Sequence, residues 1–130
     1  MSEFISNRSL EVGIVIDNLI NPICKVYPII ADKGSKFPFL VYRRTGLNEG
    51  NTKDLKVAGY IETATMELII VATKYRESIE LTKQIKTKLE RTRGLIEGIK
   101  IHDIQVINSS ENFANDAYLQ TLICRIEIEK

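Results

Sequence analysis

The sequence predicts a single α+β domain, residues 1–130, with a mainly antiparallel sheet of about four or five strands and helices on one face. Residues 60–73 and 118–129 alternate between two faces with the period of a strand. Residues 74–93 instead carry an apolar stripe at helical spacing. With the shorter segments added, the predicted order of elements is α-β-β-β-α-β-β.

The N-terminal segment predicts a helix over residues 9–20. Leu10, Ile14 and Val15 share one face of such a helix and are expected to be buried. The helix should end at Asn21-Pro22, because the residue before a proline avoids helical backbone angles.

Two strands are expected next, over residues 24–30 and 37–44, with a turn at residues 32–35 between them. Pro28 has no N–H group to donate to a neighbouring strand. The first of these strands is therefore expected at an edge of the sheet or bent.

Residues 45–59 form the longest polar stretch and predict a long flexible loop or the tip of an extended hairpin. Loops longer than about 12 residues are uncommon in compact domains and often functional. Gly46, Asn48, Gly50 and Lys53 are therefore candidate interaction residues, expected to become ordered on assembly. A simple mobile connection is an equally acceptable interpretation of the same composition.

The strand over residues 60–73 is expected near the centre of the sheet, because one of its faces is apolar throughout. A helix over residues 74–93 should follow it, capped by Thr73 and stopped by Gly94. Its expected buried stripe consists of Tyr75, Ile79, Thr82, Ile85 and Leu89, with Leu81 at the margin.

The same helix is strongly basic, with seven Lys and Arg residues, three Glu residues and a net charge of +4. Lys83, Lys86 and Lys88 are the candidate contact residues on it. A solvated face that complements the helix dipole is one interpretation, and an acidic partner or nucleic acid is the other. A nucleic-acid surface usually adds interleaved aromatic residues, and only Tyr75 lies nearby.

The C-terminal third predicts two strands. In residues 99–107 the apolar phase slips, which a β-bulge near His102-Asp103 would reconcile. Residues 108–116 are polar, with Phe113 as an apolar anchor, and lead into the closing strand. The predicted core is Ile14, Phe39, Val41, Met66, Leu68, Ile70, Ile79, Ile85, Leu89, Leu122, Cys124 and Ile126.

Composition and motifs argue against several classes of function. The chain is 44% hydrophobic and 27% charged with a net charge of +1, so a strongly basic nucleic-acid binder is excluded on bulk charge. No apolar run is long enough to span a bilayer, and no secretory signal is expected. Phosphate-binding, zinc-protease and dinucleotide motifs are absent, and His102 is the single histidine. The prediction is a non-enzymatic protein without cofactor or metal; Cys24 and Cys124 are expected to be two small buried thiols, whose proximity the sequence leaves open.

Four short strings resemble one family of tailed-phage proteins. Residues 26–34 read VYPIIADKG, and residues 37–43 read FPFLVYR. Residues 66–78 read MELIIVATKYRES, a strand that runs into a helix beginning with an aromatic residue. Residues 111–116 read ENFAND, before the closing strand. In order and spacing these strings resemble the tail-completion (head–tail joining, minor tail) proteins of siphophages, over about residues 10–129; Phe39 and Phe113 stand where many members carry tyrosine.

The resemblance implies a structural subunit of a phage or prophage tail. Such proteins form a ring, usually a hexamer, that caps the tail tube where it meets the head connector. The implied partners are further copies of the chain, the tube protein and the connector, with no membrane and with DNA at most passing through. The implied location is the bacterial cytoplasm during assembly and the virion tail afterwards.

Two other classes stay open. One is a small ligand-binding or regulatory α+β module, which should contain a sizeable apolar pocket. The other is a nucleic-acid accessory protein that uses the helix over residues 74–93.

Overall fold

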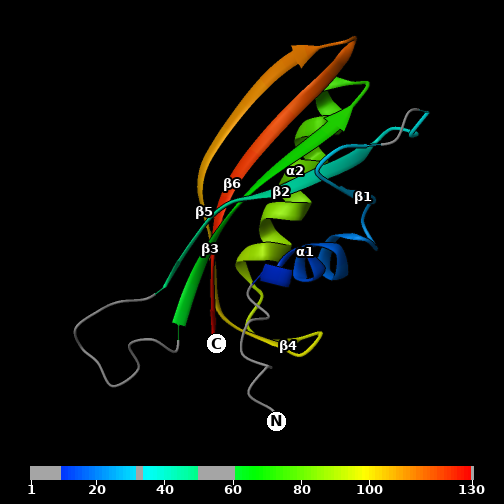
Figure 1. Cartoon of the computed structure of the whole chain (residues 1–130). Coiled ribbons are helices and arrows are strands. Elements are labelled where there is room, and N and C mark those ends of the chain that lie inside the picture. The colour runs from blue at the N-terminus through cyan, green and yellow to red at the C-terminus, as the bar shows by residue number, and fades with distance from the viewer. Residues whose placement is uncertain (1–9, 32–33, 50–60, 130) are drawn as a thin grey trace.

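A six-stranded sheet with two helices makes up the computed structural model, which describes residues 10–31, 34–49 and 61–129 (Figure 1). The elements are α1 (Gly13–Ile20), β1 (Lys25–Pro28), β2 (Phe39–Glu49), β3 (Ile61–Ala72), α2 (Tyr75–Glu90), β4 (Gly94–Ile96), β5 (Ile99–Ala114) and β6 (Ala117–Glu129). The predicted α+β class is confirmed. The sheet has one strand more than expected, because the three-residue β4 precedes β5.

The strands lie in the order β1-β2-β3-β6-β5-β4. All neighbours pair antiparallel except β1 and β2, which are parallel, so the sheet is mixed. Pro28 ends β1 at one edge of the sheet, as its missing N–H group predicted. Both helices lie on the same side of the curled sheet, where α2 packs against β3, β5 and β6 and α1 packs against β1, β2 and α2 (Figure 1).

The core lies between the two helices and one face of the sheet, with β3 and β6 at its centre. Every second residue of β3 is buried, from Glu62 to Ala72, and Leu122 to Ile128 alternate in the same way on β6. The predicted face of β3 is thus confirmed, and Met66 and Leu68 are opposite Cys124 and Leu122. None of the described helices has the length and hydropathy needed to cross a bilayer.

The predicted buried face of α1 is wrong for Leu10 and Ile14 and right for Val15. The α-helix begins at Gly13, after a short 3-10 turn, and its buried side consists of Val15, Ile16, Leu19 and Ile20. Leu10 and Ile14 are exposed, at 55% and 38%. The apolar residues nearly surround this short helix, so its rotation is decided by packing against the sheet and not by its own periodicity.

The buried stripe of α2 also differs from the prediction at its first turn. Tyr75 is 47% exposed, and Ser78 takes its place beneath the helix. The helix ends at Glu90, before Gly94, and its N-cap is Lys74 without a side-chain cap bond. Two further predicted core residues are only partly buried, Val41 and Ile79.

Two polar segments belong to strands. The strand β2 continues through residues 45–49, the first part of the range predicted as a loop, and residues 50–59 lie outside the described residues. Residues 108–114 complete β5, and Asn115 and Asp116 form a two-residue turn with φ of 53° and 60°. Positive φ at both central residues is the conformation that joins two twisted strands in a tight hairpin.

The register of β5 shifts twice against β6. One shift lies between Ile101 and Asp103, at the place where the predicted bulge near His102-Asp103 was expected. The second lies between Val106 and Asn108 and was not predicted. Bulges bend a strand and increase its twist, which accounts for the strong curl of β5 in Figure 1.

Gly13 gives a test of the contact between α1 and β2. A Cβ atom at this position would lie 2.5 Å from Cε1 of Tyr42. Alanine favours a helix by about 1 kcal/mol over glycine, but forcing the ring aside costs about 1–3 kcal/mol. We expect Gly13→Ala to lower the free energy of unfolding by about 1 kcal/mol in a urea melt. Gly46→Ala is the matched control, because its Cβ would meet Thr65 only at 3.9 Å and should leave stability unchanged.

Candidate interaction surface

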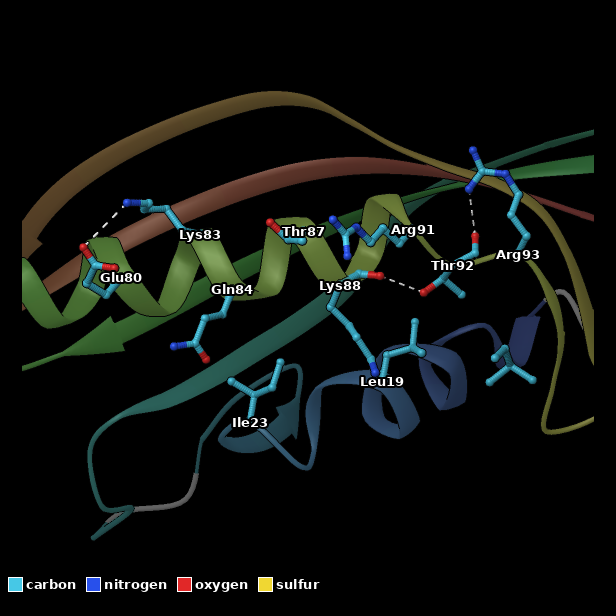
Figure 2. Close-up of a pocket in the computed structure, with 11 residues that line it drawn as sticks. Leu19, Ile23, Glu80, Lys83, Gln84, Thr87, Lys88, Arg91, Thr92 and Arg93 are labelled. Carbon is cyan, nitrogen blue, oxygen red and sulfur yellow. Dashed lines mark hydrogen bonds and ion pairs between the residues drawn. The ribbon is translucent and has the colours of Figure 1, made fainter.

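A groove separates the C-terminal half of α2 from α1. It has a volume of about 820 Å³, and Figure 2 shows its lining side chains. Apolar residues line one side, and they come from three places in the chain: Leu19, Ile23 and Ile96. Charged residues of the other side are Glu80, Lys83, Lys88, Arg91 and Arg93. We call this feature the α1–α2 groove.

Helical spacing brings the basic side of the groove together. Glu80, Lys83, Gln84, Thr87, Lys88 and Arg91 recur every three or four residues of α2 and its C-cap, so they share one face. Lys88 extends from this face across Leu19, and Gln84 points toward Ile23 (Figure 2). The residues immediately after the helix, Thr92 and Arg93, close the end of the groove.

The charges of the groove are only partly compensated. Lys83 Nζ lies 3.7 Å from Glu80 Oε2, a long contact between exposed side chains. Lys88 and Arg91 form no ion pair with any carboxylate of the described residues. Two cationic side chains therefore face solvent without a partner in the described chain, beside an apolar wall.

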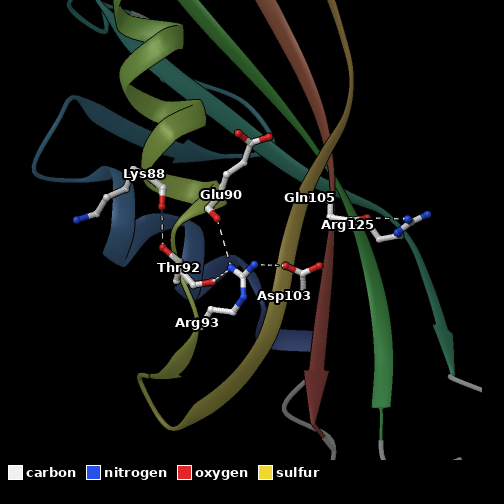
Figure 3. Close-up of polar contacts among 7 residues, drawn as sticks. All are labelled: Lys88, Glu90, Thr92, Arg93, Asp103, Gln105 and Arg125. Atoms are coloured by element: carbon white, nitrogen blue, oxygen red, sulfur yellow. Dashed lines mark hydrogen bonds and ion pairs between the residues drawn. The ribbon is translucent and has the colours of Figure 1, made fainter.

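Arg93 holds the end of the groove in place (Figure 3). Its Nη2 lies 2.8 Å from Oδ1 of Asp103 on β5, and its Nη1 donates to the carbonyl oxygens of Thr92 at 3.0 Å and Glu90 at 3.3 Å. Thr92 Oγ1 donates to the carbonyl oxygen of Lys88 at 2.7 Å. These bonds satisfy carbonyl groups that the helix end leaves without partners.

The structure places only some of the predicted interaction residues in the groove. Lys83 and Lys88 line the groove, whereas Lys86 pairs with Glu90 at 3.0 Å and does not line it. Gly46 and Asn48 lie on β2, opposite residues 65 and 63 of β3, and take no part in the groove. The remaining two, Gly50 and Lys53, lie outside the described residues.

Two arginines of the groove, Arg91 and Arg93, were not among the predicted contact residues. The signal for Arg91 was present in the sequence, because Arg91 follows Lys88 at the spacing of one helix face. The apolar wall of Leu19, Ile23 and Ile96 had no such signal, because these residues come together only through tertiary packing.

A second exposed feature is the tip of the β5–β6 hairpin, residues 111–118, at the opposite end of the molecule from α1 and β4 (Figure 1). Phe113 is 54% exposed and packs against Tyr118 with the two rings tilted by 55° and their centroids 4.8 Å apart. The rings of Tyr118 and Tyr75 pack edge to face with their centroids 5.6 Å apart, so the tip lies against the start of α2. We call this feature the hairpin tip.

Polar contacts fix the hairpin tip to α2. Glu111 Oε1 accepts hydrogen bonds from Tyr75 Oη at 3.0 Å and from Gln120 Nε2 at 3.1 Å. The hydrogen bond to Glu111 raises the pKa of Tyr75, since it stabilises the protonated phenol. Gln120 is buried and also donates to Ser78 Oγ at 3.2 Å. Glu111 and Asp116 are the only charged side chains from residue 104 to residue 124, so the tip is acidic.

The groups with potential for catalysis are separate from both features. His102 Nε2 lies 3.0 Å from Oε1 of Glu129, and this hydrogen bond lowers the pKa of the exposed Glu129 carboxyl. Burial raises the pKa of Cys24 to about 11 and that of Cys124 to about 12, so both remain protonated thiols near neutral pH. In the described part of the chain, no three His, Cys, Asp or Glu residues are grouped for metal binding.

Comparison with known proteins identifies the fold. No protein-family model matches the sequence, and no curated protein matches it. Among solved structures, a chain from the virion of a native gene transfer agent particle aligns with a TM-score of 0.60 at 10% identity, over 99% of this chain and 98% of that chain. A second solved structure aligns with a TM-score of 0.52 at 12% identity, over 100% and 96% of the two chains. The chain therefore shares one complete fold with a virion chain.

Proposed function

We propose that this protein is a structural subunit of the virion of a phage or phage-derived particle, without enzymatic activity. The observation that carries the proposal is the end-to-end match of the fold with a virion chain. The resemblance of the four sequence strings to siphophage tail-completion proteins is a separate line of support. Together they favour a role in tail completion, at the joint between head and tail.

In this proposal, several copies form a ring, a hexamer in the assembled tail, between the tail tube and the head connector. A ring needs two different surfaces on each subunit, because head-to-tail contacts close only when one surface meets the other. The α1–α2 groove and the hairpin tip are two such surfaces at opposite ends of the molecule (Figure 1). The protein would be in the cytoplasm during assembly and in the virion tail afterwards.

Disruption of the gene tests this function. In cells producing particles, we expect filled heads and completed tails to accumulate unjoined, visible by negative-stain electron microscopy. Wild-type protein supplied from a plasmid should restore joined particles. Joined, infectious or transfer-competent particles in normal yield without the protein would contradict the proposal. Neighbouring genes for a portal, a connector and a tape-measure protein would support it independently.

A ligand-binding module is the second candidate, and the volume of the groove favours it. About 820 Å³ lies within the usual range of roughly 300–1,000 Å³ for small-molecule pockets. The rim, however, is formed by long flexible Lys and Arg side chains, which suits an extended acidic surface better than an enclosed ligand. Nucleic acid is the third candidate, since Lys88 and Arg91 are uncompensated in the described chain; its test is combined with the experiment below.

A further inference from the structure

We infer that the acidic hairpin tip of one copy docks in the basic α1–α2 groove of a second copy of this chain. The inference deepens the proposed function and rests on it in one respect, because it takes the partner to be another copy within a ring. Three properties of the two surfaces support it: their charge, their shape and their positions in the molecule.

Charge complementarity is the first argument. The lining of the groove carries four basic side chains and one acidic one, and Lys88 and Arg91 have no carboxylate partner in the described residues. The hairpin tip carries Glu111 and Asp116 and no basic residue. Opposite potentials on two surfaces favour their encounter and select the correct partner.

Shape and apolar contact are the second argument. The hairpin tip is the end of the β5–β6 hairpin and presents Phe113, which is 54% exposed. The groove is concave, and its wall includes Leu19, Ile23 and Ile96. An aromatic side chain that enters an apolar recess with charged pairs around it has the arrangement of an interface anchor.

The position of the two surfaces is the third argument. The hairpin tip rests on Tyr75 at the start of α2, and the groove follows the last turns of the same helix. A helix of this length extends about 24 Å, so one molecule cannot bring its own tip into its own groove. The contact must therefore be between copies. It is head-to-tail, the kind of contact that forms a ring when the rotation between neighbouring copies closes.

The outer edge of β5 indicates why a second copy would contact the side chains of the tip and not extend the sheet by pairing a strand with β5. Alternate residues of an antiparallel strand direct their N–H groups away from the paired strand. On β5, the N–H groups of Ser109 and Phe113 donate to their neighbours' side chains, to Asn108 Oδ1 and Asn112 Oδ1, each at 2.8 Å. Two donors of this edge are therefore already used, which disfavours pairing with a strand from another chain.

Cross-linking between two purified variants, each with one added cysteine, tests the inference. Ala114→Cys places a thiol in the hairpin tip, and Gln84→Cys places one in the groove. The native Cys24 and Cys124 have raised pKa values and should react slowly with a short bis-maleimide reagent near pH 7. Asn48→Cys, exposed on β2 outside both features, is the control partner for Ala114→Cys.

We expect the Ala114→Cys and Gln84→Cys mixture to give about ten times more covalent dimer than the Asn48→Cys control mixture, equivalent to about 1.4 kcal/mol of binding preference. Adding Lys88→Glu and Arg91→Glu to the groove variant should remove this excess, and so should high salt. Lys86→Glu, an equal charge change per residue on the same helix but outside the groove, should retain it. A yield equal to the control, or one unaffected by Lys88→Glu and Arg91→Glu, would overturn the inference.

A fluorescence-anisotropy titration with a short DNA duplex identifies the rival occupant. One outcome is salt-sensitive DNA binding that is lost when Lys88→Glu and Arg91→Glu are introduced, together with cross-linking at the level of the Asn48→Cys control. That outcome would assign the groove to nucleic acid and overturn docking by a second copy. Because these assays use purified protein, their failure leaves the disruption phenotype untouched. Unjoined heads and tails with control-level cross-linking would retain the proposed function and reject this contact alone.

Discussion

Replacing Leu68 by alanine should lower the free energy of unfolding by about 2–5 kcal/mol, a large share of the roughly 5–15 kcal/mol typical of a domain. Leu68 is 0% exposed at the middle of β3, opposite Tyr42 on β2 and Leu122 on β6. Both flanking strands are held by backbone pairing, so they can collapse only partly into the space that the side chain leaves. Urea denaturation followed by circular dichroism measures the change.

Ile69→Ala is the matched control for this prediction. Ile69 is the next residue of the same strand, faces the other side of the sheet and is only partly buried. Its truncation should cost distinctly less than that of Leu68, with the same dependence of the unfolding free energy on urea in both variants. A loss below about 1 kcal/mol for Leu68→Ala would mean that the core does not lie on this face of β3.

The second large loss of stability is expected when the side-chain amide of Gln120 is replaced by a carboxylate. In Gln120→Glu, a carboxylate oxygen replaces the amide nitrogen that lies 3.1 Å from Glu111 Oε1 and 3.2 Å from Ser78 Oγ. The hydroxyl of Ser78 already donates to the carbonyl oxygen of Tyr75, at 2.7 Å, so it has no hydrogen for the new oxygen. We expect a loss of about 2–4 kcal/mol in unfolding free energy at pH 7, from buried acceptors without donors and like charges in contact.

This loss should depend on pH with a definite sign. Burial and the neighbouring carboxylate raise the folded-state pKa of the carboxyl introduced by Gln120→Glu above its unfolded value of about 4.3. The folded variant then binds more protons than the unfolded chain, so its stability falls as the pH rises above that value. Relative to wild type, the stability of Gln120→Glu should recover as the pH is lowered from 7 toward the unfolded pKa, because the protonated acid can again donate.

The exchange variant Gln120→Glu with Glu111→Gln is the control for the network. It returns one amide donor and one carboxylate acceptor to the same pair of positions, with their order reversed. Thermal melts at pH 7 should show that at least half of the lost stability returns. A single variant as stable as wild type at pH 7 would show that Gln120 and Glu111 are not in contact in solution.

The central strands could be predicted because burial decides their pattern. Residues 61–72 and 120–129 alternate strictly, since each strand pairs on both sides and packs one face under α2. The edge position of Pro28 and the first bulge of β5 followed from equally local chemistry, a missing donor and a slip of phase. In each case the physical cause lies within a few residues of the effect.

The failed predictions concern segments whose structure depends on distant contacts. Residues 107–113 of β5 are exposed at every position, so no alternation marks them as a strand. The three residues of β4 are too few for any period, and the rotation of α1 is decided by the sheet beneath it. The basic side of the groove could be predicted from the charge of α2. Its apolar wall, which includes Leu19 and Ile23, could not be predicted, because it forms only when the chain folds.

Because the turn at Asn115 and Asp116 has only two residues, the length of the β5–β6 hairpin can change without altering the rest of the fold. Beyond the second register shift, β5 pairs with β6 residue for residue, from Asn108 opposite Ile123 to Ala114 opposite Ala117. Adding two residues to each strand would lengthen the arm by about 7 Å and leave every side chain on its original face. Adding one residue to each strand would instead turn the exposed aromatic ring to the other side. If the tip docks in a neighbouring copy, inserting two residues in each strand would change the diameter of the assembly and preserve the contacts. Related proteins could in this way fit tail tubes of different diameter.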